Sequence, residues 1–382
     1  MTRDNKRRHT NLAMAWIDYQ KAYDSVPHSW IMKCLEMYKI NTTLRNMIQA
    51  SMKLWTTTLT FDKQDIGEVR IRRGIFQGDA LSPLLFCLAL NPLSEVLKKV
   101  GNEYTLANGS KINHLLYMDD LKLYSKKEAE INSLIHTTKT FSNDIKMKFG
   151  FQKCARLIIN RGKVKDTQGL QIEEGIIHDT SKDGYKYLGI PQHRSNIEHE
   201  AKEKAKKEYK KRLRQILKSR LNAKYKIDAI NIYAIPVISY TGGIVKWTVQ
   251  EMEELNRKTR KMINMYKGLH PRSDVDRLYL PRRLGGRGLK NIRDVLEGED
   301  RSFNQYIWNN TNDPLLAVVK ADDVYRRKPE RFQEWKTKKI EIRQRTWHEK
   351  PLHGQYPRQT KNVTTKDTQY RWLKEVKLKI ET

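Results

Sequence analysis

Two adjacent aspartates, Asp119 and Asp120, interrupt a segment that otherwise has the composition of buried β-structure. The β-prone runs "INHLLYM" and "LKLYS" flank them, which is the pattern of a β-hairpin with the two acids at its turn. Two explanations are open. The pair either closes an ordinary hairpin, in which Asp is a common turn residue, or presents two carboxylates to a divalent cation. The rest of the chain has to distinguish between them.

A third aspartate, Asp18, ends the apolar segment "LAMAWID", which we expect to be a short buried strand. Nucleotide polymerisation needs two divalent cations that activate the attacking hydroxyl and neutralise charge on the transferring phosphate. Magnesium prefers carboxylate oxygens and keeps ligand positions for water and phosphate. An aspartate at a strand end, beside an aspartate pair on a hairpin, meets this requirement. The three aspartates are therefore a candidate metal site.

The charge of the chain narrows the class of partner. Its 74 Lys and Arg residues exceed its 44 Asp and Glu residues by 30, an excess that favours a polyanion such as nucleic acid over a merely solvated basic surface. Cys34, Cys87 and Cys154 are far apart and indicate neither a disulfide framework nor a zinc site. The sequence shows no signal peptide and no membrane span, so we expect an intracellular protein, nuclear or cytoplasmic and not secreted. It indicates no protein partner.

Apolar periodicity predicts an α+β chain whose first half mixes strands, several of them joined by hairpins, with helices. The predicted helices cover residues 28–39, 41–55, 80–100 and 127–146, and the predicted strands cover residues 12–18, 56–61, 68–73, 155–160 and 185–190.

After about residue 190 the composition shifts towards basic helices. Residues 201–226 contain nine Lys and three Arg against two Glu. Apolar residues from Tyr209 to Leu221 keep helical spacing, which predicts one amphipathic helix with a basic outer face. That face contacts a polyanion or is simply solvated. Helices are also expected over 226–240 and 248–269, and "LPRRLGGRGL" (280–289) is expected to be a loop.

Five segments, in order, resemble motifs A to E of reverse transcriptases. The resemblance covers residues 12–190 closely and 195–380 more loosely, and "QGDALSP" with the later "LYLPRRLGGRGL" is most similar to enzymes of non-LTR (LINE-type) retrotransposons. In chain order the segments are "AWIDYQKAYDSVPHSWI" for motif A, "RRGIFQGDALSPLLFCLALNPL" for B, "YMDD" for C, "KFGFQKCARLII" for D and "YKYLGI" for E.

The resemblance implies a polymerase palm with an antiparallel sheet and packed helices over residues 1–194, a helical thumb over 195–270 and a basic, helical post-thumb linker over 271–382. It implies an RNA-directed DNA polymerase that adds deoxynucleotides to a primer 3′-OH by two-metal catalysis. Its cofactor would be two Mg²⁺ ions, with Mn²⁺ as a substitute, and its partners an RNA template, a DNA primer and a dNTP. The alternatives are an inactive retroelement relic that only binds nucleic acid and an RNA-templated RNA polymerase.

The same resemblance assigns roles to individual residues. Tyr23 would exclude a ribose 2′-OH, although a core aromatic is the alternative, and Gln77 and Gly78 could equally form an ordinary turn. We expect Asp79 to cap the helix after it and Asp24 to be structural. The implied sites are Asp18, Asp119 and Asp120 for the metal, with Lys153 as a further catalytic residue; Tyr23, Gln77 and Gly78 for the nucleotide; Tyr187, Leu188 and Gly189 for the primer grip; and Lys206, Lys207, Lys210, Lys211 and Arg214 for the nucleic-acid backbone.

The ends of the chain depart from the family pattern. Family members have a fingers region that grips the triphosphate ahead of motif A, whereas few residues precede Asp18 here. The final "YRWLKEVKLKIET" resembles the stretch before a Cys/His knuckle and an endonuclease in some non-LTR elements. We therefore expect a chain truncated at both ends, without fingers and endonuclease, and with weakened triphosphate binding.

Overall fold

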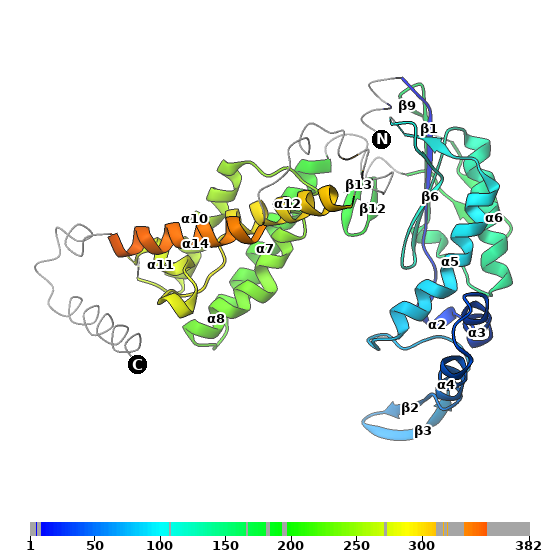
Figure 1. Ribbon diagram of the computed structural model, residues 1–382, viewed down its shortest axis with the longest axis horizontal. Coiled ribbons are helices and arrows are strands. Elements are labelled where there is room, and N and C mark those ends of the chain that lie inside the picture. The colour runs from blue at the N-terminus through cyan, green and yellow to red at the C-terminus, as the bar shows by residue number, and fades with distance from the viewer. Residues whose placement is uncertain are drawn as a thin grey trace, which may run out of the picture. The chain divides into compact units, whose positions relative to one another are not determined.

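Strands mixed with helices, followed by helices alone, make up the computed structural model of the chain (Figure 1). The predicted α+β class is confirmed. The chain divides into two units, Met1–Ser195 and Asn196–Thr382. The structure describes residues 9–310 except 107, 166, 181–183, 193–196 and 271–272, together with residues 332–349 and positions 5, 316 and 319. Among these residues, no helix combines the length and apolar composition needed to cross a membrane.

The first unit is built on a five-stranded antiparallel sheet. The strand order is β6-β7-β1-β8-β9, so β1 lies at the centre and pairs with both β7 and β8. All six residues of β1 are buried, which explains why its sequence is a continuous apolar run and not an alternating one. The strands are β1 (Leu12–Ile17), β6 (His114–Tyr117), β7 (Asp120–Ser125), β8 (Ala155–Asn160) and β9 (Lys163–Lys165).

The two faces of this sheet are covered differently. Alternate residues of a strand point to opposite faces, and Ala13, Ala15 and Ile17 join the core cluster formed with helices α5 (Ser82–Val100) and α6 (Glu128–Asp144). Figure 1 shows these two helices beside the sheet. Trp16 points to the other face, which also carries the candidate site. The main core of this unit therefore packs against the sheet face opposite the candidate site.

Smaller elements complete the first unit. The remaining helices are α2 (Ala22–Ser25), α3 (His28–Met37), α4 (Thr42–Lys53) and the 3₁₀ turn η1 (Phe151–Lys153). The paired hairpins are β2 (Thr56–Phe61) with β3 (Gln64–Arg70), β4 (Tyr104–Thr105) with β5 (Lys111–Ile112), β10 (Leu170–Ile172) with β11 (Gly175–Ile177), and β12 (Tyr185–Tyr187) with β13 (Ile190–Gln192).

The prediction of one strand over 185–190 is wrong, because this segment is a hairpin. Tyr187 pairs with Ile190 around a two-residue turn of Leu188 and Gly189. Both turn residues have positive φ, 46° and 76°, which is the backbone that a tight hairpin turn requires. The strand predicted over 68–73 begins earlier, at Gln64, and ends at Arg70.

The second unit is entirely helical in its described part. Its helices are α7 (Ile197–Lys218), α8 (Ala223–Ala229), α9 (Ile235–Ser239), α10 (Val249–Met265), α11 (Val275–Tyr279), α12 (Ile292–Asn309) and α14 (Phe332–Glu349), with a π turn over Ile230–Ala234 and the 3₁₀ turn η3 (Arg282–Leu284). The predicted loop at 280–289 thus includes η3.

The single helix predicted over 201–226 is also wrong in extent. Helix α7 ends at Lys218, and α8 starts after Asn222, whose side chain accepts a hydrogen bond of 3.0 Å from the backbone N–H of Tyr225. Asparagine is a strong N-cap residue, so it favours a new helix start at this position. The helix predicted over 226–240 continues through a π turn just before Pro236, whose missing N–H and ring disturb the regular helical pattern.

One core holds the second unit together. Tyr209, Leu213 and Leu217, four residues apart on α7, are buried against residues of α9, α10 and α12. Leu278 of α11 and Leu296 of α12 belong to the same cluster. The predicted thumb and the described start of the predicted post-thumb region therefore share a core. Residues 350–382, including "YRWLKEVKLKIET", lie outside the described residues.

Candidate active site

Strand register brings Asp18 and Asp120 together. Trp16 pairs with Lys122 and Ile17 pairs with Leu121 across β1 and β7. Extending this register by one residue places Asp18, directly after β1, opposite Asp120, the first residue of β7. The two aspartates are far apart in sequence, and antiparallel pairing alone makes them neighbours.

Asp119 occupies the tip of the β6–β7 hairpin. Tyr117 pairs with Asp120, so Met118 and Asp119 form a two-residue turn, in which Met118 has a φ of 54°. The turn explanation is therefore confirmed for Asp119, and the metal explanation stays a prediction. Asp119 is a turn residue, and Asp120 begins the strand whose register leads to Asp18.

Lys153 approaches Asp18 from the opposite side. Ala155 of β8 pairs with Trp16, so Lys153, two residues earlier, comes beside Asp18. Its Nζ lies 3.5 Å from Asp18 Oδ2. The Lys153 side chain is 74% exposed and that of Asp18 is 18% exposed, so Lys153 reaches the carboxylate from solvent and can turn towards another anion.

Gly150 and Cys154 hold the Asp18 backbone, and sequence reasoning assigned neither of them a role. The Gly150 N–H donates to the Asp18 carbonyl at 2.8 Å, and the Asp18 N–H donates to Cys154 Sγ at 3.4 Å. A Cβ on Gly150 would lie 2.7 Å from Asp18 Oδ2. The usable signal was the glycine three residues before Lys153 in "KFGFQKC". A glycine there leaves space for the carboxylate.

The electrostatics of the site oppose three ionised carboxylates. Burial raises the pKa of Asp18, Lys153 lowers it and Asp119 raises it further. Burial also raises the pKa of Asp120, and the charges of Asp119 and Asp18 add to that rise. A bound cation would relieve this repulsion.

The donor chemistry of the three aspartates fits a hard divalent cation such as Mg²⁺, which takes oxygen ligands. Within the described part of the chain, no three His, Cys, Asp or Glu side chains converge closely enough to enclose an ion. Asp18 is paired with Lys153.

Tyr23 has features of both explanations given for it. Its ring stacks on Phe86 of α5, with centroids 4.8 Å apart and planes 10° from parallel. Burial raises the pKa of its hydroxyl, and Cys87 and Asp119 contribute to that rise. The ring is thus packed against Phe86 of the core, while its hydroxyl lies within electrostatic range of Asp119 on the β6–β7 hairpin.

Gln77 and Gly78 form an exposed turn before α5. Gly78 has a φ of 98° and open space where a Cβ would be. Glycine is therefore favoured here by the backbone conformation, and not by a lack of space for a side chain. The predicted capping role of Asp79 is confirmed. Its Oδ2 accepts hydrogen bonds from the backbone N–H groups of Leu81 and Ser82 at 3.2 and 3.1 Å.

The predicted primer-grip residues lie on the β12–β13 hairpin. Tyr187 ends β12, and Leu188 and Gly189 form the turn. Tyr185 of the same hairpin stacks on Trp16, with centroids 4.9 Å apart and planes 22° from parallel. The hairpin therefore lies on the sheet face that carries Asp18.

The basic side chains of α7 differ in their availability. Lys206 is only 18% exposed and pairs with Glu203 at 3.0 Å and with Glu251 at 3.5 Å. Lys207 and Arg214 are exposed and have no ion-pair partner among the described residues. Lys211, also exposed, lies 3.9 Å from Glu208, and Lys210 is half-buried.

Lys218 was not assigned a role from the sequence, but it extends this surface. Positions 207, 211, 214 and 218 recur every three or four residues and so share one helix face, opposite the buried apolar residues. Their spacing was visible in the sequence. We call Lys207, Lys211, Arg214 and Lys218 the basic stripe.

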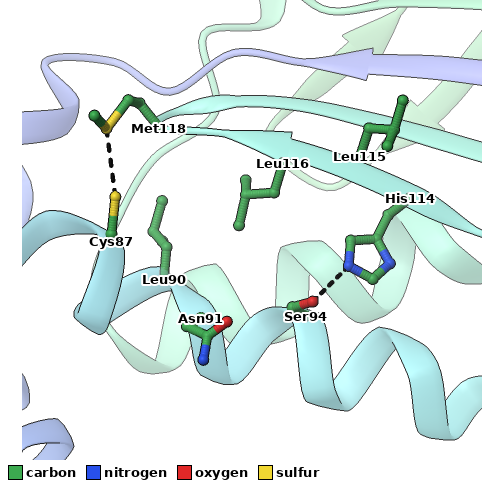
Figure 2. Close-up of a pocket in the computed structure, with 8 residues that line it drawn as sticks. All are labelled: Cys87, Leu90, Asn91, Ser94, His114, Leu115, Leu116 and Met118. Atoms are coloured by element: carbon green, nitrogen blue, oxygen red, sulfur yellow. Dashed lines mark hydrogen bonds between the residues drawn. The ribbon is translucent and has the colours of Figure 1, made fainter. Parts of the chain in front are cut away.

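A pocket of about 280 Å³ lies between α5 and β6 (Figure 2). His114 Nε2 is 2.6 Å from Ser94 Oγ at one end, and Cys87 Sγ is 3.4 Å from Met118 Sδ at the other. Met118 belongs to the β6–β7 turn beside Asp119, so the pocket borders the candidate site. Its lining combines apolar side chains with the polar Asn91, Ser94 and His114, and the predicted site residues do not contribute to it.

An antiparallel sheet with an aspartate at the end of one strand and an aspartate pair on the neighbouring hairpin is a polymerase palm. The model of the family described as "Reverse transcriptase (RNA-dependent DNA polymerase)" matches residues 2–192, half of the chain. The chain belongs to the reverse transcriptase family.

Curated relatives agree with the predicted resemblance to non-LTR elements. The "Retrovirus-related Pol polyprotein from type-1 retrotransposable element R2" of Popillia japonica is 24% identical over 285 residues, 72% of this chain and 46% of the relative. That from "type-2 retrotransposable element R2DM" of Drosophila melanogaster is 24% identical over 295 residues, 74% of this chain and 27% of the relative. The chain thus spans less than half the length of these two relatives.

Among solved structures, the chain is similar to telomerase from Candida albicans in complex with a TWJ fragment of telomeric RNA. The identity is 12%, the TM-score is 0.39, and the match covers 90% of this chain and 51% of that one. Apo telomerase from Candida tropicalis, truncated from its C-terminal domain, matches with 14% identity and a TM-score of 0.34, over 44% of this chain and 38% of that one.

Proposed function

We propose that the chain is an RNA-directed DNA polymerase fragment that adds deoxynucleotides to a primer 3′-OH on an RNA template. The observation that carries the proposal is the meeting of Asp18 and Asp120 by strand register, with Asp119 at the adjacent hairpin tip. Membership of the reverse transcriptase family supports it. In this proposal residues 1–194 are the palm and residues 195–270 the thumb, followed by the post-thumb region.

Asp18, Asp119 and Asp120 would hold two Mg²⁺ ions, or Mn²⁺ in their place. When bound, these ions lower the pKa of the primer hydroxyl and neutralise the charge that develops on the transferring phosphate. The pKa values of Asp18 and Asp120 are raised mainly by burial and further by neighbouring carboxylate charge, and this supports the assignment because a bound cation would favour the ionised forms of both groups.

Other residues would bind and orient the nucleotide. The exposed ammonium of Lys153, already 3.5 Å from an Asp18 oxygen, is placed to leave that carboxylate for the triphosphate and to protonate the departing pyrophosphate. Tyr23, braced on Phe86, would block a ribose 2′-OH and so select deoxynucleotides. The backbone of Gln77 and Gly78 would lie against the new base pair.

The second unit would bind the template–primer duplex through the basic stripe of α7. Between positions 207 and 218 this stripe extends about 16 Å at 1.5 Å per residue. Such contacts would be independent of sequence and sensitive to salt. Lys210 would contribute at its edge. Lys206 is the weakest member of the predicted set, because two glutamates already neutralise it.

Primer extension on an RNA template with Mg²⁺ tests the proposal. The wild type should extend the primer with dNTPs, and Asp119→Asn should reduce extension by at least a hundredfold, because it removes one ionised ligand without changing the side-chain shape. Asp65→Asn is the matched control, since Asp65 is an exposed acid on β3, away from the site. It should extend like the wild type.

Equal extension by the wild type and Asp119→Asn would exclude the catalytic role. A chain that binds duplex at low salt, loses it steeply as salt is added and incorporates no nucleotide would instead be the nucleic-acid-binding relic. The extension and binding measurements on one preparation therefore separate the two functions.

A further inference from the structure

Lys122 is a buried cation on the same sheet face as the catalytic carboxylates. It follows Asp120 by two residues on β7, and its partner Trp16 precedes Asp18 by two residues on β1. Because side chains two residues apart in a strand share a face, the Asp18–Asp120 pair continues directly into the Trp16–Lys122 pair. No role described above uses this lysine.

The surroundings of Lys122 are aromatic and not acidic. The residue is only 7% exposed, and its Nζ lies 4.9 Å from the ring centroid of Trp16 and 5.3 Å from those of Tyr124 and Tyr187. No carboxylate among the residues that the structure describes forms an ion pair with it. Burying a cation without a counter-ion is costly, so the rings and one neutral acceptor must offset that cost.

That acceptor belongs to a different element. Lys122 Nζ donates a hydrogen bond of 2.6 Å to Gln192 Oε1 on β13, while Tyr187, under the same ammonium, ends β12. The lysine therefore joins β7 of the large sheet to both strands of the β12–β13 hairpin. Together with the stacking of Tyr185 on Trp16, these contacts attach the hairpin to the sheet.

Strand pairing between the described parts of the chain does not supply this attachment. Within the described residues, β12 and β13 pair only with each other and form a separate two-stranded sheet. Among the described residues, side-chain contacts hold the hairpin on this sheet face, and the ammonium of Lys122 reaches both of its strands.

We propose that Lys122 is a positioning residue that fixes the β12–β13 hairpin against the catalytic face and thereby places the primer 3′ end relative to Asp18 and Asp120. This inference rests on the proposed polymerase function, in which residues 187–189 grip the primer. Lys122 itself touches no substrate. It acts through the hairpin that it holds.

Hydrogen exchange of the hairpin amides tests the attachment without requiring catalysis. In Lys122→Met, which keeps the length of the stem and removes the charge, exchange of residues 185–192 should accelerate at least tenfold while β1 and α5 keep their protection. Lys186→Met is the matched control, because Lys186 is an exposed lysine on the same hairpin. Lys122→Arg keeps a cation over the rings and should restore part of the protection. Unchanged exchange in Lys122→Met would overturn the proposal.

Primer extension tests the consequence for the primer. In Lys122→Met, kcat should fall about tenfold while the KM for dNTP, the Kd for template–primer and the thermal stability stay near wild-type values, and Lys122→Arg should recover part of kcat. A lysine needed only for folding would instead lower stability together with kcat. An unchanged kcat would overturn the placement of the primer end. If the wild type extends no primer, the proposed function fails, and hydrogen exchange alone then decides whether Lys122 fixes the hairpin.

Discussion

Replacing Gly150 with alanine should damage catalysis and spare the fold. Gly150 has a φ of −86° and a ψ of 70°, a backbone conformation that alanine also adopts. The substitution restricts the unfolded chain, which by itself stabilises a protein by about 0.4–1 kcal/mol. We therefore expect the free energy of unfolding to stay within about 1 kcal/mol of the wild-type value.

The new methyl group would collide with the carboxylate of Asp18, a proposed metal ligand. It would lie 2.7 Å from Asp18 Oδ2, whereas ordinary contacts begin at 3.4 Å, so the oxygen must move by about 0.7 Å. A displacement of 1 Å in a catalytic site can cost about a hundredfold in rate. We expect primer extension to fall by roughly ten- to a hundredfold, about 1.4–2.7 kcal/mol of lost transition-state stabilisation.

Gly101→Ala is the control with the opposite expectation, a loss of stability without a loss of activity. Gly101 has a φ of 75° and open space around the position of a Cβ, so alanine there strains the backbone at a cost of about 1–3 kcal/mol without touching the site. Chemical unfolding and primer extension, measured well below the melting temperature, should show Gly101→Ala less stable and fully active. Wild-type extension by Gly150→Ala, or a loss that parallels its unfolding, would refute the reasoning.

Three further predictions test other parts of the molecule. Tyr23→Ala should raise ribonucleotide use relative to deoxynucleotide use by roughly tenfold, measured by single-nucleotide incorporation, whereas Tyr23→Phe should not. An unchanged ratio in Tyr23→Ala would contradict the proposal that Tyr23 blocks the ribose 2′-OH. Lys207→Ala should lower the slope of log affinity for duplex against log salt by about 1. Lys206→Ala should leave that slope unchanged, because Lys206 is already paired with two glutamates of its own unit. Equal slopes for both variants would contradict the proposed role of the basic stripe. Burial acts to raise the pKa of Glu251, but hydrogen bonds from Lys202 and Thr248 lower it to about 2 from an ordinary 4.5. Because the folded state holds the ionised form, stability should decline as pH falls from 4.5 towards 2, and Glu251→Gln should flatten that decline in thermal unfolding followed by circular dichroism.

Much of the fold was predictable because local pattern and tertiary position agree. The apolar run of β1 and the helical spacing on α7 both correspond to buried faces in the structure. The errors arose where one residue changes the backbone. Positive φ at Leu188 and Gly189 folds a predicted strand into a hairpin, and the cap at Asn222 divides a predicted helix. Apolar periodicity carries no information about either event.

The candidate site was predictable from motifs, but its supports were not. Asp18 and Asp120 could be paired only by expecting their strands to be neighbours, and the register fulfils that expectation. Gly150 and Cys154 contact Asp18 across a long sequence separation, and although the glycine before Lys153 was visible in the sequence, its contact with Asp18 was not. Lys122 was one lysine among many basic residues, and only burial among aromatic rings distinguishes it.

The two faces of the central sheet carry different kinds of residue. On one face, Ala13, Ala15 and Ile17 join an apolar core and carry no charge. On the other face, burial disfavours the charged forms of three groups, because it raises the pKa values of Asp18 and Asp120 and lowers that of Lys122. Because alternate residues of the same strands supply both faces, the apolar face can offset that cost directly behind the site. Substitutions of the three aspartates should therefore lose activity and keep the fold, whereas substitutions at any position of β1, whose six residues are all buried, should also lower stability.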